Sequence, residues 1–157
     1  QHLIGKSADY DVLKKYDIPP RSIEIELTES LFYNDMKSLS VLVSRIHHAG
    51  LSCSIDDFGS GYSSLNMLKD VKVDALKLDR VFFESGDNYE RGKDIIQSVI
   101  KLAQALDLHT ISEGVEERKQ VEFLKEMHCD LIQGYVFAKP MPVPEFEQLA
   151  FGTEAAD

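Results

Sequence analysis

Long apolar runs are missing from the 157 residues of this sequence. No stretch approaches the roughly 18 consecutive apolar residues that can cross a membrane. The start, Gln1-His2-Leu3, has neither the basic flank nor the apolar core of a signal peptide. We therefore expect a cytoplasmic protein without a membrane segment. Because the chain begins with Gln, we also expect it to be a piece of a longer protein, such as the cytosolic part of a multidomain one.

Basic residues are scarce. Lys and Arg total 17 against 27 Asp and Glu, so the formal net charge is −10. Such a surface repels polyanions, which argues against duplex DNA, duplex RNA and anionic membranes as partners. A small phosphate ligand stays compatible with the sequence, provided that cations mediate its contact with the protein.

Sulfur and imidazole groups form no metal-binding pattern. The two cysteines, Cys53 and Cys129, have no metal-ligand spacing, and we expect reduced, buried thiols. The five histidines also lack such spacing and are interpreted as surface or packing residues. The sequence has no G-x-S-x-G elbow and no P-loop lysine, which argues against the usual serine hydrolases and P-loop enzymes.

Short segments in which polar and apolar residues alternate are followed, along the chain, by longer amphipathic segments. The sequence has no internal repeat and no obvious linker. We predict strands over 23–28, 51–56, 74–79, 108–112 and 131–135. We predict helices over 8–16, 36–49, 62–69, 92–106, 117–127 and 144–150. This alternation predicts a single α/β domain, with about five strand–helix units around a mostly parallel sheet.

Predicted strands carry polar side chains on one face. Residues two apart share a strand face, and the polar positions are Glu24 and Glu26, then Ser52, Ser54 and Asp56, then Lys77 and Asp79, continued by Glu113 and Gln133. A polar face inside a parallel sheet costs stability unless its charges are paired or bind metal. We therefore predict a ligand site at the C-terminal strand ends, as in barrel enzymes.

Carboxylates gather at or near the ends of these strands. They are Glu26, the adjacent pair Asp56 and Asp57, Asp79, and Glu113. Hard oxygen ligands suit Mg²⁺ or Mn²⁺, and two such ions about 3.5–4 Å apart can bind a phosphodiester and activate a water. A lone Asp-Asp pair is usually a solvated turn cap, but the polar strand faces around this one favour a metal site.

Two further segments allow both a structural and a functional interpretation. Lys77, mid-strand on the polar face, could form a structural salt bridge, or it could hold an attacking water and neutralise developing charge. The segment 57–64, which contains Gly59 and Gly61, could donate backbone N–H groups to an anion. As a glycine loop alone, it supports anion binding only weakly.

Five motifs stand in order along the chain. They are Glu26-Leu-Thr-Glu29-Ser30, Asp56-Asp57-Phe-Gly-Ser-Gly-Tyr-Ser-Ser-Leu65, Leu76-Lys77-Leu-Asp79-Arg80, Glu113-Gly-Val-Glu116, and Gln133-Gly-Tyr135 with Pro140. In order and spacing they resemble the EAL domains, bacterial cyclic di-GMP phosphodiesterases of (β/α) barrel fold, over nearly the whole chain. Ser60 and Ser112 stand where that family usually has Thr and Ala.

The resemblance implies a role for each matching residue. The implied metal ligands are Glu26, Asp56, Asp57 and Glu113, with Asp56 bridging two Mg²⁺ or Mn²⁺ ions. Lys77 would contact the catalytic water, and Glu113 could instead act as a general base. Supporting roles in the site or its loops fall to Glu29, Gly59, Gly61, Asp79, Glu116 and Gln133. The implied reaction hydrolyses one phosphodiester bond of cyclic di-GMP to linear pGpG.

The chain departs from this family in length. Eight strand–helix units take about 250 residues, so 157 residues imply a partial TIM-like barrel, the C-terminal part of the domain, over 1–157. The Glu-Ala-Leu strand and the next strand, with its Asn ligand, are absent, and the metal site is expected to be empty or half-occupied. We predict very little or no hydrolysis by this chain alone. The alternative is a non-catalytic module that binds cyclic di-GMP or another protein.

An incomplete barrel also leaves two sheet edges and part of its apolar interior exposed. We therefore expect a homodimer or another assembly that covers these surfaces.

Overall fold

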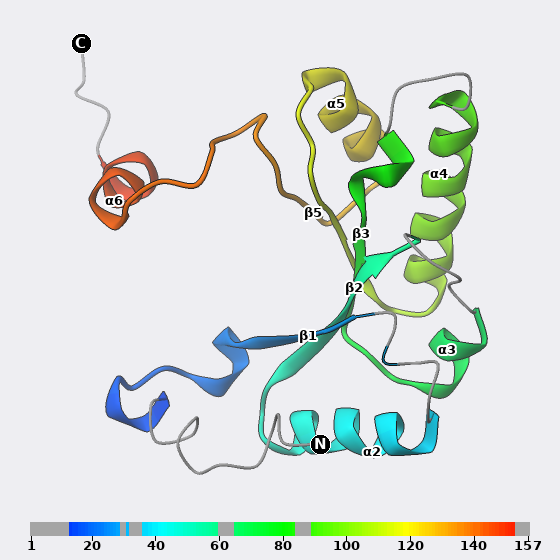
Figure 1. Cartoon of the computed structure of the whole chain (residues 1–157), viewed down its shortest axis with the longest axis vertical. Coiled ribbons are helices and arrows are strands. Elements are labelled where there is room, and N and C mark those ends of the chain that lie inside the picture. Colours follow the sequence, from blue (N-terminus) through cyan, green and yellow to red (C-terminus); the bar gives the residue numbers. More distant parts are fainter. Residues whose placement is uncertain (1–12, 29–30, 32–35, 60–64, 84–88, 153–157) are drawn as a thin grey trace.

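A computed structural model describes residues 13–28, 31, 36–59, 65–83 and 89–152 (Figure 1). Its centre is one five-stranded sheet. The strands are β1 (Glu24–Thr28), β2 (Ser52–Phe58), β3 (Ala75–Leu78), β4 (His109–Ser112) and β5 (Leu131–Ile132). They lie in chain order, and every neighbouring pair is parallel. The predicted α/β class with a parallel sheet is confirmed.

Helices connect the strands. They are α2 (Met36–His48), α3 (Leu65–Asp70), α4 (Tyr89–Ala105), α5 (Arg118–Glu126) and α6 (Val143–Phe151), with short 3₁₀ turns η1 (Pro20–Ser22) and η3 (Arg80–Phe83). Helices α2 to α5 lie along one side of the curved sheet, whereas α6 stands apart from it (Figure 1). No helix among the described residues is long and apolar enough to cross a membrane.

The hydrophobic core fills the space between the sheet and these helices. Parallel pairing places Leu27 beside Ile55 and Ile55 beside Leu76, so one face of the sheet is continuously apolar. Helices α2 and α4 cover this face with side chains that are themselves buried. The largest fully buried hydrophobic side chains are Ile46, Ile55, Leu76, Leu78, Ile96, Ile100 and Leu124. Burial of this apolar surface is the main contribution that stabilises the fold.

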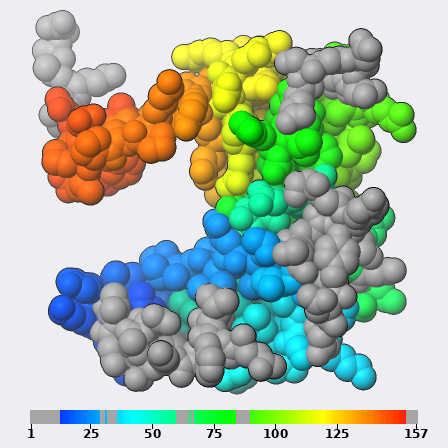
Figure 2. Space-filling view, viewed as in Figure 1, coloured from blue at the N-terminus to red at the C-terminus, as the bar shows by residue number. Residues whose placement is uncertain are grey.

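The opposite, concave face of the sheet is polar. The register sets Glu26 beside Ser54 and Thr28 beside Asp56, and the alternation of β3 places Lys77 on the same face. Figure 2 shows this side of the molecule as a wide opening between the orange C-terminal segment and the blue N-terminal segment. The described helices therefore leave this face accessible.

Two ends of the predicted elements differ from the structure. Strand β5 stops at Ile132 rather than 135, because the following residues bond the loop after β4: Val115 N–H donates to Gln133 O at 3.1 Å, and Val136 N–H donates to Val115 O at 3.1 Å. Helix α4 begins at Tyr89, before the predicted residue 92. Residues 8–12 of the predicted helix over 8–16 lie outside the described part of the chain, and residues 13–15 are helical.

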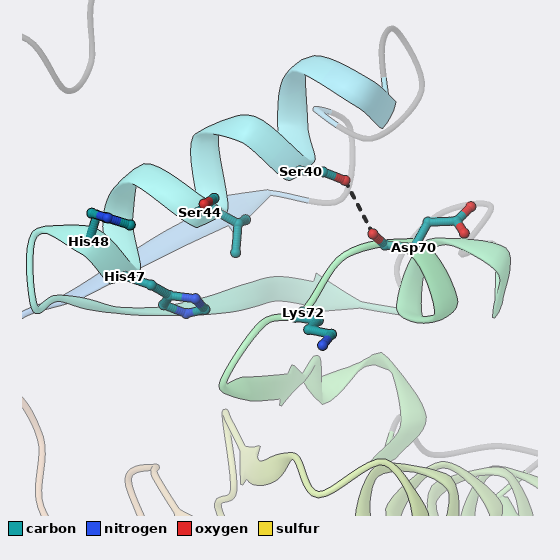
Figure 3. A pocket seen from close by; sticks show the side chains of 7 residues that line it. Ser40, Ser44, His47, His48, Asp70 and Lys72 are labelled. Carbon is teal, nitrogen blue, oxygen red and sulfur yellow. Dashed lines mark hydrogen bonds between the residues drawn. The ribbon is translucent and has the colours of Figure 1, made fainter.

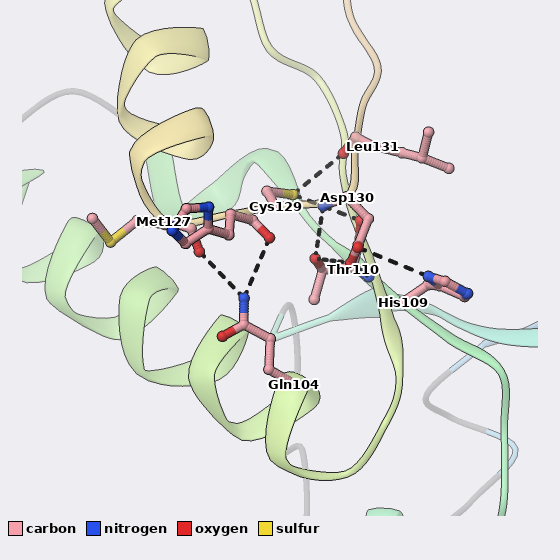
Figure 4. A network of polar contacts seen from close by, with 8 residues as sticks. Gln104, His109, Thr110, Met127, Cys129, Asp130 and Leu131 are labelled. Carbon is pink, nitrogen blue, oxygen red and sulfur yellow. Dashed lines mark hydrogen bonds and ion pairs between the residues drawn. The ribbon is translucent and has the colours of Figure 1, made fainter.

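An aspartate directly before a strand ties that strand to the one before it in the sheet. Asp74 precedes β3, and its Oδ2 accepts the N–H of Cys53 in β2 at 2.8 Å. Asp130 precedes β5, and its Oδ2 accepts the N–H and the hydroxyl of Thr110 in β4, both at 2.8 Å (Figure 4). The same network includes Gln104 of α4, whose amide donates to two carbonyl oxygens at the end of α5. These bonds fix the register at the N-terminal end of the sheet.

Replacement of Asp130 by Asn is expected to destabilise the fold in a pH-dependent way. Partial burial opposes ionisation, but the hydrogen bonds from Thr110 outweigh it and hold the pKa of Asp130 below its ordinary value. A lowered pKa stabilises the folded state above pH 3.8, and that stabilisation is lost as the pH falls through the folded-state pKa. Urea unfolding of Asp130→Asn should show a loss of about 1 kcal/mol at pH 7 that shrinks below pH 4. A loss independent of pH would contradict this assignment.

Two buried hydroxyls among the described residues lack a hydrogen-bond partner, that of Ser54 on the polar face and that of Ser112 on the opposite face. Ser112 is fully buried on the helix-covered face, and its Oγ makes no hydrogen bond. Because an unsatisfied buried hydroxyl costs free energy, Ser112→Ala is expected to leave the unfolding free energy unchanged or to raise it by about 1 kcal/mol. Thr110→Val is the matched control: it removes a bonded hydroxyl from the same strand and should lower stability by about 1–2 kcal/mol. Thermal unfolding of both variants measures the difference.

Candidate metal centre

Lys77 is the centre of the polar face. Its side chain is only 8% exposed, and its Nζ lies 2.5 Å from Glu26 Oε1, 2.9 Å from Glu113 Oε1 and 3.0 Å from Asp56 Oδ1. One ammonium thus joins carboxylates from β1, β2 and the end of β4. This confirms the salt bridge that the sequence allowed, and it draws together acids far apart in the chain.

The carboxylates keep Lys77 charged. Burial by itself would lower the pKa of this ammonium, but the hydrogen bonds that it donates to Glu26, Glu113 and Asp56 outweigh burial and raise the pKa above its usual value. A raised lysine pKa stabilises the folded state at every pH below the unfolded value of 10.5. The stabilisation is lost only in strong alkali, as the pH passes the folded-state pKa, so the ion pairs are complete at neutral pH.

An irregularity at the end of β2 brings two adjacent aspartates together. In a regular strand, Asp56 and Asp57 would point to opposite faces. The register shifts between Ile55 and Phe58, and Asp57 has a φ of 54°, in the left-handed region that Asp and Asn tolerate better than most residues. The two carboxylates can therefore serve one site. Such a backbone conformation is costly and is typical of functional positions.

Three carboxylates converge there. Ligand oxygens of Asp56, Asp57 and Glu113 all lie within 4.8 Å of one another. Partial desolvation and the charges of Asp56, Asp79 and Glu113 raise the pKa of Asp57. Asp56 Oδ1 is buried, and its partner is the ammonium of Lys77 at 3.0 Å. Converging carboxylate oxygens with a surplus of negative charge fit a hard divalent cation such as Mg²⁺ or Mn²⁺.

A tight turn after β4 orients Glu113. Its N–H donates to Leu78 O at 3.0 Å, which continues the β3–β4 pairing by one residue. Gly114 follows with a φ of 63°, and a Cβ there would lie 2.6 Å from the Cβ of Arg80. Only glycine combines this backbone angle with this approach, so the Glu-Gly pair seen in the sequence serves the turn.

The other described residues that the sequence predicts for the site are not among the three converging carboxylates. Glu26, half exposed, reaches the acidic cluster through Lys77 and is not one of the three converging ligands. Asp79 Oδ1 accepts the N–H of Val81 at 2.7 Å, beside Asp57. Glu116 is exposed, and its N–H donates to the side chain of Gln120. Glu29 and Gly61 lie outside the described residues.

The glycine segment after Asp57 packs on an aromatic ring that sequence reasoning missed. Gly59 has a φ of 96°, and a Cβ there would lie 2.0 Å from the ring of Phe82. Its described role is therefore close packing. Residues 60–64 of the segment 57–64 lie outside the described part of the chain, so the binding of an anion by this segment stays a prediction. No pattern in the sequence predicts this contact, because Gly59 and Phe82 are 23 residues apart in the chain.

A hollow of about 540 Å³ adjoins the cluster on the concave face. Glu26 and Lys77 line one part of it, and Gln133, Gly134 and Phe137 line another. Gln133 thus lies on the polar face, as its position in the alternation predicts, and it shares the hollow with Glu26 and Lys77. The hollow can admit a small polar ligand beside the acidic cluster.

Substitution of Lys77 by Met is expected to lower stability by about 3 kcal/mol, because three carboxylates would lose their shared cation. Lys119→Met removes a lysine from an exposed pair with Glu117 and should change stability by less than about 0.5 kcal/mol. Chemical denaturation at neutral pH compares the two variants. Equal effects would show that Lys77 is not the centre of the network.

The family model and the similar proteins point to the same family. The model of the family described as "EAL domain" matches residues 8–140. The cyclic di-GMP phosphodiesterase NbdA of Pseudomonas aeruginosa is 42% identical over 126 residues, covering 80% of this chain and 16% of that protein. The chain spans between 16% and 36% of the length of the curated relatives to which it was compared.

Solved structures agree with the sequence match. The EAL domain of Mycobacterium smegmatis DcpA superposes with a TM-score of 0.83 at 32% identity, over 94% of this chain and 67% of that one. The PaMucR phosphodiesterase in complex with c-di-GMP gives a TM-score of 0.78 at 32% identity, over 87% of this chain and 56% of that one. The five-stranded sheet with its helices thus corresponds to part of these chains.

Proposed function

The chain belongs to the EAL domain family, and from this premise we propose that its acidic cluster is part of a site for metal-dependent hydrolysis of cyclic di-GMP. In the complete domain, one phosphodiester bond is cleaved to give linear pGpG. The convergence of Asp56, Asp57 and Glu113 beside the buried Lys77 carries this proposal. Relatives named as cyclic di-GMP phosphodiesterases and a neighbour solved with c-di-GMP support it.

Each residue of the cluster has a distinct task in this proposal. Asp56, Asp57 and Glu113 would hold Mg²⁺ or Mn²⁺, with Glu26 as a further ligand once its carboxylate is released from Lys77. The bound cation would supply Lewis-acid polarisation of the phosphodiester and its attacking water. Lys77 neutralises charge that develops on the phosphoryl oxygens, and Glu113 can accept the proton of the attacking water. The hollow beside Gln133, which Lys77 also lines, gives a small dianion room to approach.

We further propose that the 157-residue polypeptide, as a truncated domain, hydrolyses cyclic di-GMP very little or not at all alone. Two bound metals need more oxygen ligands than the three converging carboxylates and Glu26 supply among the described residues. With Mn²⁺ and cyclic di-GMP, product formation by the wild type should not exceed that of Glu113→Gln, as measured by chromatography of the nucleotides. Ordinary turnover by the wild-type chain that the variant lacks would refute this part.

Metal binding is tested separately from turnover. Asp57→Asn keeps a residue that tolerates the left-handed backbone and removes one ligand charge, so Mn²⁺ affinity should fall at least about tenfold in calorimetry. Asp94→Asn, on the exposed face of α4, is the control and should bind Mn²⁺ as the wild type does. Equal affinity of all three proteins would exclude the acidic cluster as the metal site.

A second candidate is a non-catalytic module that binds cyclic di-GMP or a second copy of the chain. The outer strands β1 and β5 each have one neighbour, and nearby apolar side chains such as Leu131 (59% exposed) and Phe137 (62% exposed) face solvent. Open edges and exposed apolar groups favour association. Light scattering is expected to give a dimer or larger assembly, and a compact monomer would count against it. Calorimetry with cyclic di-GMP, with and without metal, tests ligand binding.

A further inference from the structure

A second group of potential metal ligands lies at the opposite end of the sheet. His47 is in the last turn of α2, Cys53 is near the start of β2, and Asp74 directly precedes β3. One ligand atom from each lies within 4.8 Å of the other two. His47 Nε2 is 2.9 Å from Asp74 Oδ2 and 3.7 Å from Cys53 Sγ. These ligands come from three separate elements, which is why no spacing in the sequence revealed them.

The backbone holds this group in place before any ligand binds. Cys53 N–H donates to Asp74 Oδ2, Asp74 N–H donates to Cys53 O, and His109 N–H donates to Asp74 O, at 2.8, 2.8 and 3.0 Å. Both Cys53 and Asp74 are thereby fixed in the parallel sheet, and His47 extends from a helix packed on the same core. A rigid group pays little conformational entropy when it binds an ion.

The corresponding aspartate elsewhere in the sheet separates a structural role from a ligand role. Asp130 makes the same bond to a strand N–H, and its Oδ2 also accepts the hydroxyl of Thr110. His109 Nδ1 lies 3.9 Å from Asp130 Oδ1, but among the described residues no thiol completes a group of three ligand atoms with this pair. Register fixing therefore accounts for the carboxylate at both places, and the thiol of Cys53 is what distinguishes the group at Asp74.

We propose that His47, Cys53 and Asp74 form a binding site for a thiophilic divalent cation, with Zn²⁺ as the best match. Imidazole nitrogen, thiolate sulfur and carboxylate oxygen are the three ligand types of protein zinc sites, which are nearly always four-coordinate. With three protein ligands, the fourth position is left for a water. The mixed soft and borderline ligands distinguish this site from the all-oxygen cluster at Asp56, which suits Mg²⁺ or Mn²⁺.

The thiol must lose its proton when the metal–sulfur bond forms, and the proton leaves to solvent. Burial and the neighbouring charge of Asp74 raise the pKa of Cys53 to about 12, so the thiol is unreactive as a free nucleophile. A cation placed among these residues neutralises Asp74 and stabilises the thiolate. The cost of deprotonation selects for metals that bind sulfur strongly and against Mg²⁺.

Solvent reaches the site from one side. The side chains of His47 and Asp74 are 37% and 40% exposed. His47 also lines a cleft of about 610 Å³ between α2 and the segment after α3, with Ser44 and Lys72 among its other lining residues (Figure 3). An ion can therefore enter without unfolding of the core, although Cys53 is fully buried.

Cobalt titration of the full chain under reducing conditions tests the site. Excess Mg²⁺ occupies the acidic cluster, and Co²⁺ serves as a spectroscopic substitute for Zn²⁺. The wild type should develop a thiolate-to-cobalt charge-transfer band that saturates at one equivalent of Co²⁺. Zn²⁺ should displace the Co²⁺, abolish the band and raise the Tm of the protein. His47→Gln should weaken cobalt binding at least about tenfold, and Cys53→Ser should remove the band.

Matched controls come from neighbouring or equivalent residues. His48→Gln alters the adjacent histidine, and Cys129→Ser alters the other cysteine of the chain; both should titrate as the wild type does. Circular dichroism confirms folding, and if Cys53→Ser fails to fold, the exposed His47→Gln decides the question. The proposal is overturned by a wild type without the band, by a band that survives Cys53→Ser, or by His47→Gln binding as tightly as the wild type.

Discussion

The concave face of this domain depends on one buried cation. Lys77 lies within hydrogen-bond distance of carboxylates from three strands or strand ends, and without it these acids would repel one another across a poorly solvated sheet. The same ammonium that compensates the acids also gathers them at one place. Stability and site geometry therefore both depend on the ion pairs of this one lysine with the surrounding carboxylates.

The two ends of the sheet use aspartate differently. At the N-terminal end, Asp74 and Asp130 each accept a strand N–H and fix the register, and Asp74 also meets His47 and Cys53. At the C-terminal end, Asp56 and Asp57 lie where the register shifts, and Asp57 has a left-handed φ of 54°. A costly backbone conformation beside clustered charge is the pattern of a functional site, whereas ordinary strand geometry with satisfied bonds is the pattern of a scaffold.

Much of the fold was predictable because periodicity reports which face of an element is buried. The strand around Ile25 and the helix around Val43 and Ile46 were found within a residue or two of their ends. Element ends that depend on distant partners were not: β5 stops early because the chain near Gln133 bonds to Val115. The roles assigned to Glu29 and Gly61 fall outside the described residues and stay predictions.

The α/β class, the alternation of polar and apolar strand faces, and the family resemblance follow from the amino-acid sequence alone, because each depends on local spacing and motif order. The fold sets which acids meet. In the folded chain, Glu26 is not one of the three converging carboxylates, and a register shift in β2 places Asp57 beside Asp56. His47, Cys53 and Asp74 also lie together. Such meetings depend on register and packing between elements, and neither is encoded in the spacing along one segment.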